Sequence, residues 1–100
     1  MTTLSLSNNV ERHRYEATID GKLAGFSEYN LSGDSVVFTH TEVQEEGKGV
    51  GSFLAREALL DARAKGMHVI PVCPFIAAYL RKHREFIDLV KPEVQVAFKV

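Results

Sequence analysis

The sequence has a single cysteine, no tryptophan and no long apolar run. One cysteine excludes an intramolecular disulfide, and no apolar run approaches the roughly 18 residues of a membrane span. The formal net charge is −1, so composition gives no reason to expect a nucleic acid or an anionic membrane as partner. The N-terminal MTTLSLSNN lacks the basic and then apolar pattern of a signal peptide, and we expect a cytoplasmic protein.

What the sequence does contain predicts a single domain over residues 1–100. A hydrophobic share of 45% is typical of a globular chain, and 100 residues can bury a small core. The first half alternates with a period of two and has turn signals at Asp20-Gly21 and Ser32-Gly33-Asp34, which predicts an antiparallel meander. Its strands are expected at Arg14–Asp20, Leu23–Tyr29 and Ser35–Val43, with Thr3–Ser7 as a first strand or a loose arm.

The second half changes to a helical period after Gly51. One apolar stripe with helical spacing ends at Gly66, a good C-terminal stop, and consists of Leu54, Ala55, Ala58, Leu59 and Ala62. The elements expected after this helix are a strand at Met67–Val72, a helix from Pro74 to about His83, a short helical turn at Glu85–Val90 and a late strand at Glu93–Val100.

A strand, a helix and a second strand in this order require a parallel pair with a crossover connection. The sheet is therefore expected to be mixed, and the fold class to be α+β or α/β. Pro71 falls inside the second of these strands, where it cannot donate a ladder hydrogen bond. This strand is therefore either an edge strand or parts from its neighbour at Pro71.

Three glycines, Gly47, Gly49 and Gly51, stand between the long strand and the helix. The N–H groups at a helix N-terminus attract anions, and a loop without Cβ atoms lets a phosphate approach them closely. A tight turn that needs positive φ is the alternative explanation. The spacing is not that of a Walker A loop, since Gly49 follows Lys48, nor the G-x-G-x-x-G of a dinucleotide fold.

Three segments in this order resemble the small, single-domain GNAT-like family of N-acetyltransferases. They are Val36–Val43 with its T-H-T-E-V, the loop E-G-K-G-V-G, and His68–His83 with its P-x-C-P-F. The resemblance covers roughly Glu11–Val90, although Glu46 replaces the usual Arg or Gln of the glycine-loop motif. It implies a parallel strand pair that splays apart around the pantetheine arm of acetyl-CoA, which would also account for Pro71.

The resemblance implies acetyl transfer from acetyl-CoA to an amine of a small molecule or a protein lysine. A non-catalytic acyl-CoA-binding or sensing module and an interaction adaptor are the alternatives. No metal is expected, because the four histidines show no ligand spacing. The residues expected to hold coenzyme A are Val43, Gly47, Lys48, Gly49, Val50, Gly51, Ser52, Cys73 and Lys82.

Acetyl transfer needs a base for the amine and an acid for the departing thiolate. Cys73 directly precedes Pro74, so we expect it to cap a helix whose dipole favours a thiolate. The resemblance makes it a candidate for a covalent acetyl intermediate, and a buried packing residue is the alternative. Tyr79 lies on the same helix, where the resemblance implies a proton donor to the thiolate; a packed aromatic is the alternative.

His40 and Glu42 are two residues apart on the long strand, so we expect them to share a face with Phe38. They are candidates for a catalytic base and the group that orients it, or for a solvated face. A basic cluster ends the second helix and either complements the helix C-terminus or meets the adenosine 3′-phosphate. Its members are Arg81, Lys82, His83 and Arg84.

Overall fold

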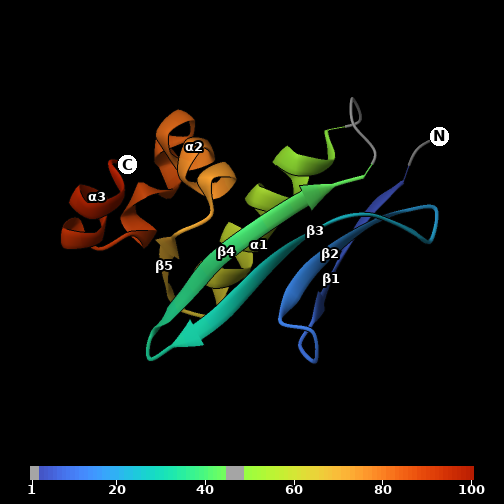
Figure 1. The fold of residues 1–100 in the computed structure, drawn as a ribbon, viewed down its shortest axis with the longest axis horizontal. Coiled ribbons are helices and arrows are strands. Elements are labelled where there is room, and N and C mark those ends of the chain that lie inside the picture. Colours follow the sequence, from blue (N-terminus) through green and yellow to red (C-terminus); the bar gives the residue numbers. More distant parts are fainter. Residues whose placement is uncertain (1–2, 45–48) are drawn as a thin grey trace.

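The structure is a computed structural model that describes residues 3–44 and 49–100. It contains one five-stranded sheet in the order β1-β2-β3-β4-β5; α1 follows the first four strands, and the other helices follow β5 (Figure 1). The elements are β1 (Leu4–Asn9), β2 (Arg14–Ile19), β3 (Lys22–Ser32), β4 (Ser35–Val43), α1 (Val50–Ala64), β5 (His68–Pro71), α2 (Pro74–Lys82), the 3-10 helix η1 (Arg84–Leu89) and α3 (Pro92–Phe98). The first four strands are antiparallel neighbours and β5 is parallel to β4, which confirms the mixed sheet and the α+β class.

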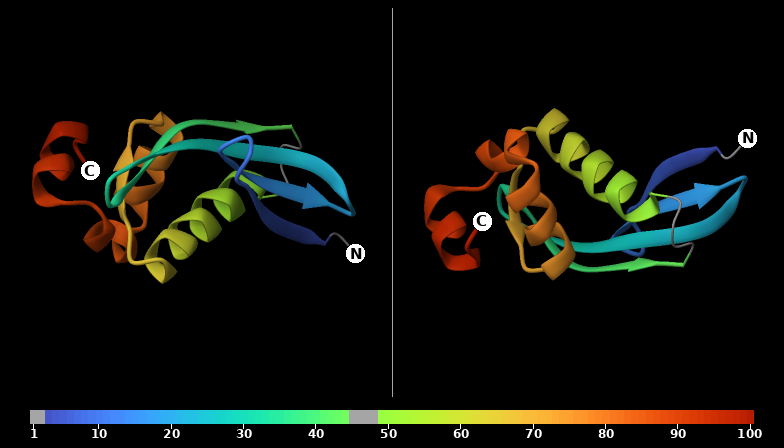
Figure 2. Two further views of the ribbon diagram at one scale, coloured as in Figure 1. Left: turned by 90° about the horizontal axis from the view of Figure 1, so that it is seen from below. Right: turned by 90° about the horizontal axis from the view of Figure 1, so that it is seen from above.

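Helix α1 crosses one face of the sheet and contacts all five strands. Its predicted stripe is buried, and the fully buried Leu54 and Leu59 each stabilise the fold by about 1.5–3 kcal/mol. The N-terminal part of the helix comes close to β3 at Gly25, where an added Cβ would lie 2.8 Å from the Glu42 carbonyl oxygen and 3.0 Å from Val50 Cγ1. Figure 2 shows α1 on one side of β3 and β4, and no described helix covers the other side.

A β-bulge interrupts the pairing of β3 with β4. His40 pairs with Glu28 but Phe38 pairs with Tyr29, so Thr39 is the extra residue. A bulge moves the following side chains to the other face. Phe38 is therefore fully buried beneath α1, whereas His40 and Glu42 are exposed, and the prediction that the three share one face is wrong.

The pairing of β4 with β5 is short. It runs from Ser35 opposite His68 to Phe38 opposite Pro71, and β5 is also the edge of the sheet. Both interpretations of Pro71 are thus confirmed. Beyond the pair the Cys73 N–H donates to the Phe38 carbonyl oxygen at 2.7 Å, and β4 continues to Val43 without a described partner on that side. We call this opening the fork.

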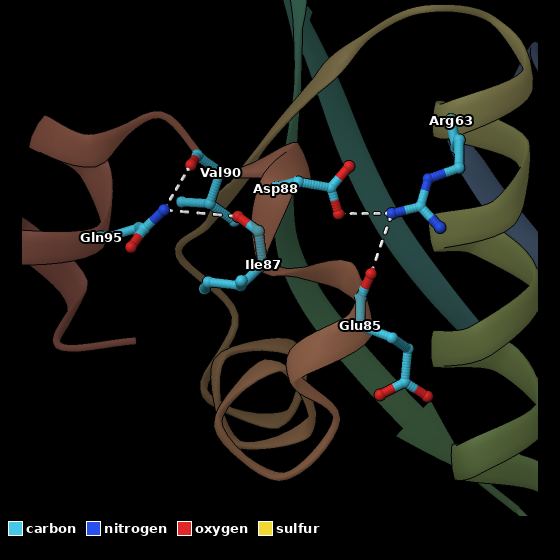
Figure 3. A network of polar contacts seen from close by, with 6 residues as sticks. All are labelled: Arg63, Glu85, Ile87, Asp88, Val90 and Gln95. Carbon is cyan, nitrogen blue, oxygen red and sulfur yellow. Dashed lines mark hydrogen bonds and ion pairs between the residues drawn. The ribbon is translucent and has the colours of Figure 1, made fainter.

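The C-terminal residues form helix α3, so the predicted strand at Glu93–Val100 is wrong. Pro92 occupies the first turn, where its missing N–H costs no hydrogen bond and its fixed φ suits a helix. Gln95 Nε2 donates to the carbonyl oxygens of Ile87 and Val90 at 3.4 and 2.8 Å, which holds α3 against η1 (Figure 3). These contacts replace the sheet pairing that the apolar alternation suggested.

Candidate active site at the fork

Cys73 lies at the fork and is 1% exposed. It takes the predicted N-cap position of α2, but its thiol makes no capping hydrogen bond with described residues. Instead Sγ donates to Thr41 Oγ1 at 3.3 Å, and Thr41 Oγ1 lies 2.9 Å from Ser27 Oγ. The thiol therefore points toward β4 and joins a short chain of polar groups across β3, β4 and the fork.

Ser27 and Thr41 were not predicted as site residues. They pair directly across β3 and β4, and Ser27 is fully buried. Their contact depends on the register after the bulge, which a single sequence does not reveal. A small hydroxyl residue inside an otherwise apolar strand face is the one signal that could have indicated Ser27.

Tyr79 lies on α2 and lines a cavity of about 230 Å³ between the two helices, which we call the helix cavity. Its other lining residues are Ser52, Phe75, Ala78, Lys82 and His83. The Tyr79 ring stacks on the His83 ring at 4.1 Å between centroids. Burial of the phenol, with the nearby charge of Glu85, raises the pKa of Tyr79 above its usual value. The hydroxyl therefore stays protonated at neutral pH, which is the form that a proton donor needs.

The helix cavity opens beside the first turn of α1, whose N–H groups carry partial positive charge. That turn contains no acidic residue, and Lys82 adds a positive charge on the α2 side. Ser52 is exposed there and lines the cavity. The arrangement can attract an anionic group such as a phosphate.

The glycines of the loop serve two different purposes. Gly49 is left-handed, with φ 72°, at the N-cap of α1, as a tight turn requires. An added Cβ at Gly51 would lie 2.7 Å from Phe75 Cζ, so this glycine makes room for α2. Phe75 therefore takes the space that a Cβ of Gly51 would occupy, so the missing Cβ at this position serves the packing of α2. Gly47 and Lys48, like Glu46, lie outside the described residues.

The side chains of the remaining predicted cofactor residues, Val50 and Val43, differ in their exposure to solvent. The Val50 side chain is 1% exposed and packs beside Gly25, so only its backbone could meet a ligand. Val43 is half-buried, and its Cγ2 atom would lie 3.4 Å from a Cβ at Gly51. Val43 thus lies where β4, α1 and Phe75 meet.

His40 and Glu42 lie on the face of β4 opposite to Thr41 and Cys73. Their Nε2 and Oε1 atoms are 3.8 Å apart, and both side chains are 55% exposed. The two residues flank Thr41 along the strand, so their side chains point to the other face. The structure brings Cys73 and Thr41 together. It places His40 and Glu42, the predicted base and its orienting group, on the opposite face of the sheet.

The basic cluster at the end of α2 is divided. Arg81 donates from Nε to the Lys99 carbonyl oxygen and from Nη2 to that of Phe98, at 2.8 and 3.0 Å, so it holds the end of α3. Lys82 and His83 line the helix cavity, and Arg84 is exposed. Of the four residues, only Lys82 and His83 are placed to meet a ligand in that cavity.

No group of three or more His, Cys, Asp or Glu side chains in residues 3–44 and 49–100 is arranged to hold a metal ion. Within the same part of the chain, no helix is both long and apolar enough to cross a bilayer.

Comparison with protein families identifies the fold. A family described as GCN5-related N-acetyl-transferase matches residues 14–89, from the start of β2 to the end of η1. The match includes β4, the fork, the start of α1 and the whole of α2, and it spans well over half of the chain. No curated protein sequence matches the chain significantly. The chain therefore belongs to the GCN5-related N-acetyltransferase family.

Proposed function

We propose that this protein transfers the acetyl group of acetyl-CoA to an amine at the fork between β4 and β5. The observation that carries the proposal is the helix cavity. It combines a helix N-terminus, the positive charge of Lys82 and a tyrosine whose hydroxyl stays protonated. These are the groups that a CoA thioester needs for its phosphates and for its leaving sulfur.

The backbone at the start of α1 would hold the CoA phosphates. The N–H groups of Val50, Gly51 and Ser52 lie in the first turn of the helix, and Lys82 supplies a counter-charge. Gly47 and Lys48 complete the proposed site on the strength of the sequence alone. The helix cavity, at about 230 Å³, takes part of a CoA molecule, and the fork takes the arm that carries the thioester.

The chemistry that fits this arrangement is direct transfer. The ammonium of the acceptor first loses a proton to a base or to solvent, since its pKa is near 10.4 for a lysine-type amine. The nitrogen lone pair then attacks the thioester carbonyl carbon, a C–N bond forms and the C–S bond breaks. Tyr79 gives its proton to the departing sulfur and regains one from the nitrogen. Ammonium and acetyl-CoA thus become an amide, CoA thiol and one released proton.

A route through Cys73 is less well supported. In that route the Cys73 thiol and acetyl-CoA exchange the acetyl group, giving acetyl-Cys73 and CoA thiol, and the amine attacks afterwards. The thiol is almost fully buried and donates a hydrogen bond to Thr41 Oγ1. Because the thiol is buried, this position favours direct attack by the amine.

A second candidate function is acyl-CoA binding without turnover. The exposed position of His40 and Glu42, across the sheet from Cys73, favours it, because no other predicted base lies at the fork. Isothermal titration with acetyl-CoA and CoA tests the binding that both functions share. Acetyl-CoA-dependent release of CoA thiol in the presence of a primary amine then separates them. Binding with no amine-dependent release would support the binding module and contradict the transferase.

A further inference from the structure

A second cavity, of about 280 Å³, lies on the other side of the sheet, and we call it the sheet-face cavity. It is built by the turn between β1 and β2, the middle of β3 and the bulge of β4, and its lining residues are Arg12, His13, Glu28, Tyr29, Asn30 and Thr39. None of them lines the helix cavity. Glu28 and Asn30 flank the buried Tyr29 along β3, so their side chains point away from α1.

The sheet-face cavity contains one charged side chain of each sign that forms no salt bridge within the described residues. The Glu28 carboxylate is half-buried and takes part in no salt bridge or side-chain hydrogen bond of the described residues. The Arg12 guanidinium is exposed, and in the described residues only its backbone N–H is bonded, to Asn9 Oδ1 at 3.2 Å. Arg12 adds only a weak charge effect on Glu16, whose pKa is lowered chiefly by its hydrogen bond to Arg14.

This cavity lies next to the fork. Thr39, which lines it, directly follows Phe38, whose carbonyl oxygen accepts the Cys73 N–H at the base of the fork. Thr39 Oγ1 also donates to the Glu28 carbonyl oxygen at 3.3 Å, so the bulge joins the two walls of the cavity. His40 follows on the same face as Glu28, its partner across the strands. A molecule held here would reach the fork from the side that α1 and α2 leave open.

We infer that the sheet-face cavity holds the acetyl acceptor, and that this acceptor is a small amine that also carries a carboxylate, as amino acids do. Glu28 receives the ammonium and Arg12 the carboxylate, by charge-assisted hydrogen bonds. The volume lies just below the lower end of the range for drug-sized ligands, roughly 300 Å³, which suits a small zwitterion. This inference rests on the proposed function, because it supplies that reaction with its second substrate.

The first test measures binding without chemistry. The full chain saturated with CoA is titrated with glycine and its longer homologues up to 6-aminohexanoate, and with alkylamines of matched length, while the backbone amide signals are followed by NMR. We expect at least one amino acid of the series to shift the Asn30 and Thr39 signals and to bind at least tenfold more tightly than its alkylamine. Equal affinity for the two compounds, or tighter binding of a lysine peptide with blocked termini, would overturn the inference.

Matched variants test the two charges. Glu28→Gln and Arg12→Gln should each weaken the binding of that amino acid about tenfold, while Glu93→Gln on α3 should leave it unchanged. Circular dichroism and the CoA titration show whether each variant remains folded. Unchanged amino-acid affinity in folded Glu28→Gln and Arg12→Gln variants would remove this cavity as the acceptor site.

Turnover separates the inference from the function on which it rests. If amines are acetylated without any preference for a carboxylate, the transferase proposal stands and the acceptor class is wrong. If the amino acid binds at Asn30 and Thr39 but no amine is acetylated, the transferase proposal fails, and the role of the cavity as an acceptor site fails with it. We expect acetylation of the amino acid that binds most tightly.

Discussion

The two faces of the sheet differ in whether their polar side chains bond to one another or remain exposed. On the face beneath α1 the few polar side chains satisfy one another, as Ser27, Thr41 and Cys73 do at the fork. On the open face charged side chains cover the strands, and the Arg14 guanidinium lies 4.3 Å from the centre of the Phe26 ring. The covered face is thus built for stability and for one narrow opening, whereas the open face keeps charges available to a ligand.

The largest expected effect compares two phenylalanines on these faces. Phe38 is fully buried under α1, so Phe38→Ala should cost about 3–5 kcal/mol of unfolding free energy, including the cavity it leaves. Phe26 is 8% exposed and lies against Arg14 and His40, so Phe26→Ala should cost about 2 kcal/mol, because solvent can fill the space. Urea unfolding with an unchanged m-value measures both. Equal losses would mean that the open face is packed as tightly as the covered one.

The next effect concerns the proton donor of the helix cavity. Tyr79→Phe should lower kcat about 100-fold, equivalent to about 2.7 kcal/mol, and leave CoA affinity within a few-fold. Tyr15→Phe is the matched control, since the Tyr15 hydroxyl bonds to Asp61 away from the fork. A full-rate Tyr79→Phe variant would show that the sulfur is protonated by another group.

The raised pKa of Tyr79 also predicts the pH profile. A raised pKa keeps the phenol protonated to higher pH than an exposed tyrosine, whose pKa is about 10. The donor should therefore remain active throughout the alkaline range in which the amine gains its free-base form, and kcat should fall only as pH passes the raised pKa. If wild-type kcat already falls as the pH rises toward about 9, and this fall is absent in Tyr79→Phe, the assignment is contradicted.

A smaller effect separates turn geometry from ligand binding. Gly49 and Gly33 both have positive φ, 72° and 59°, and an added Cβ would meet no atom within 4 Å at either position. Alanine should therefore cost a similar 1–2 kcal/mol of stability at each. Only Gly49→Ala should also weaken CoA binding, by about tenfold or about 1.4 kcal/mol, because it disturbs the start of α1. Equal CoA affinity in the two variants would show that the glycine loop is not part of the cofactor site.

The smallest effect divides the basic cluster. Lys82→Gln should weaken CoA binding a few-fold at low salt, and the difference should shrink as salt screens the charge. Arg81→Gln should leave CoA affinity unchanged and instead loosen α3, because it removes two hydrogen bonds to the C-terminal carbonyls. Titration calorimetry at two salt concentrations, with hydrogen exchange of α3, measures both. A reversed pattern would place the phosphates near Arg81.

Local patterns in the sequence predicted most elements of this fold. Asp20-Gly21 marks the turn between β2 and β3, the apolar stripe marks α1, and Pro71 indicated where β4 and β5 part. These signals work because each depends on neighbouring residues or on one constrained backbone angle. Helix α3 was mistaken for a strand because alternating Val94, Val96 and Phe98 suit a strand, while the contacts of Gln95 with Ile87 and Val90 lie in another segment.

The candidate site was less accessible to sequence reasoning. Cys73 and Tyr79 were predicted at the fork and on α2, where the structure places them. The sequence did not predict the bulge at Thr39. It therefore did not show which face of the sheet carries His40 and Glu42 and which carries Thr41. Register and bulges arise from pairing between distant strands, so one sequence without its fold does not fix them.

The central claim is that CoA binds on the covered face, between α1 and α2, and leaves the open face for the acceptor. Mapping the backbone amide shifts on titration with CoA tests it most directly. We predict that the shifts concentrate at Gly51, Ser52, Cys73, Tyr79 and Lys82, while the signals of Arg12, Glu28 and Asn30 stay unchanged. Shifts centred on Arg12, Glu28 and Asn30, with none at the start of α1, would contradict the account.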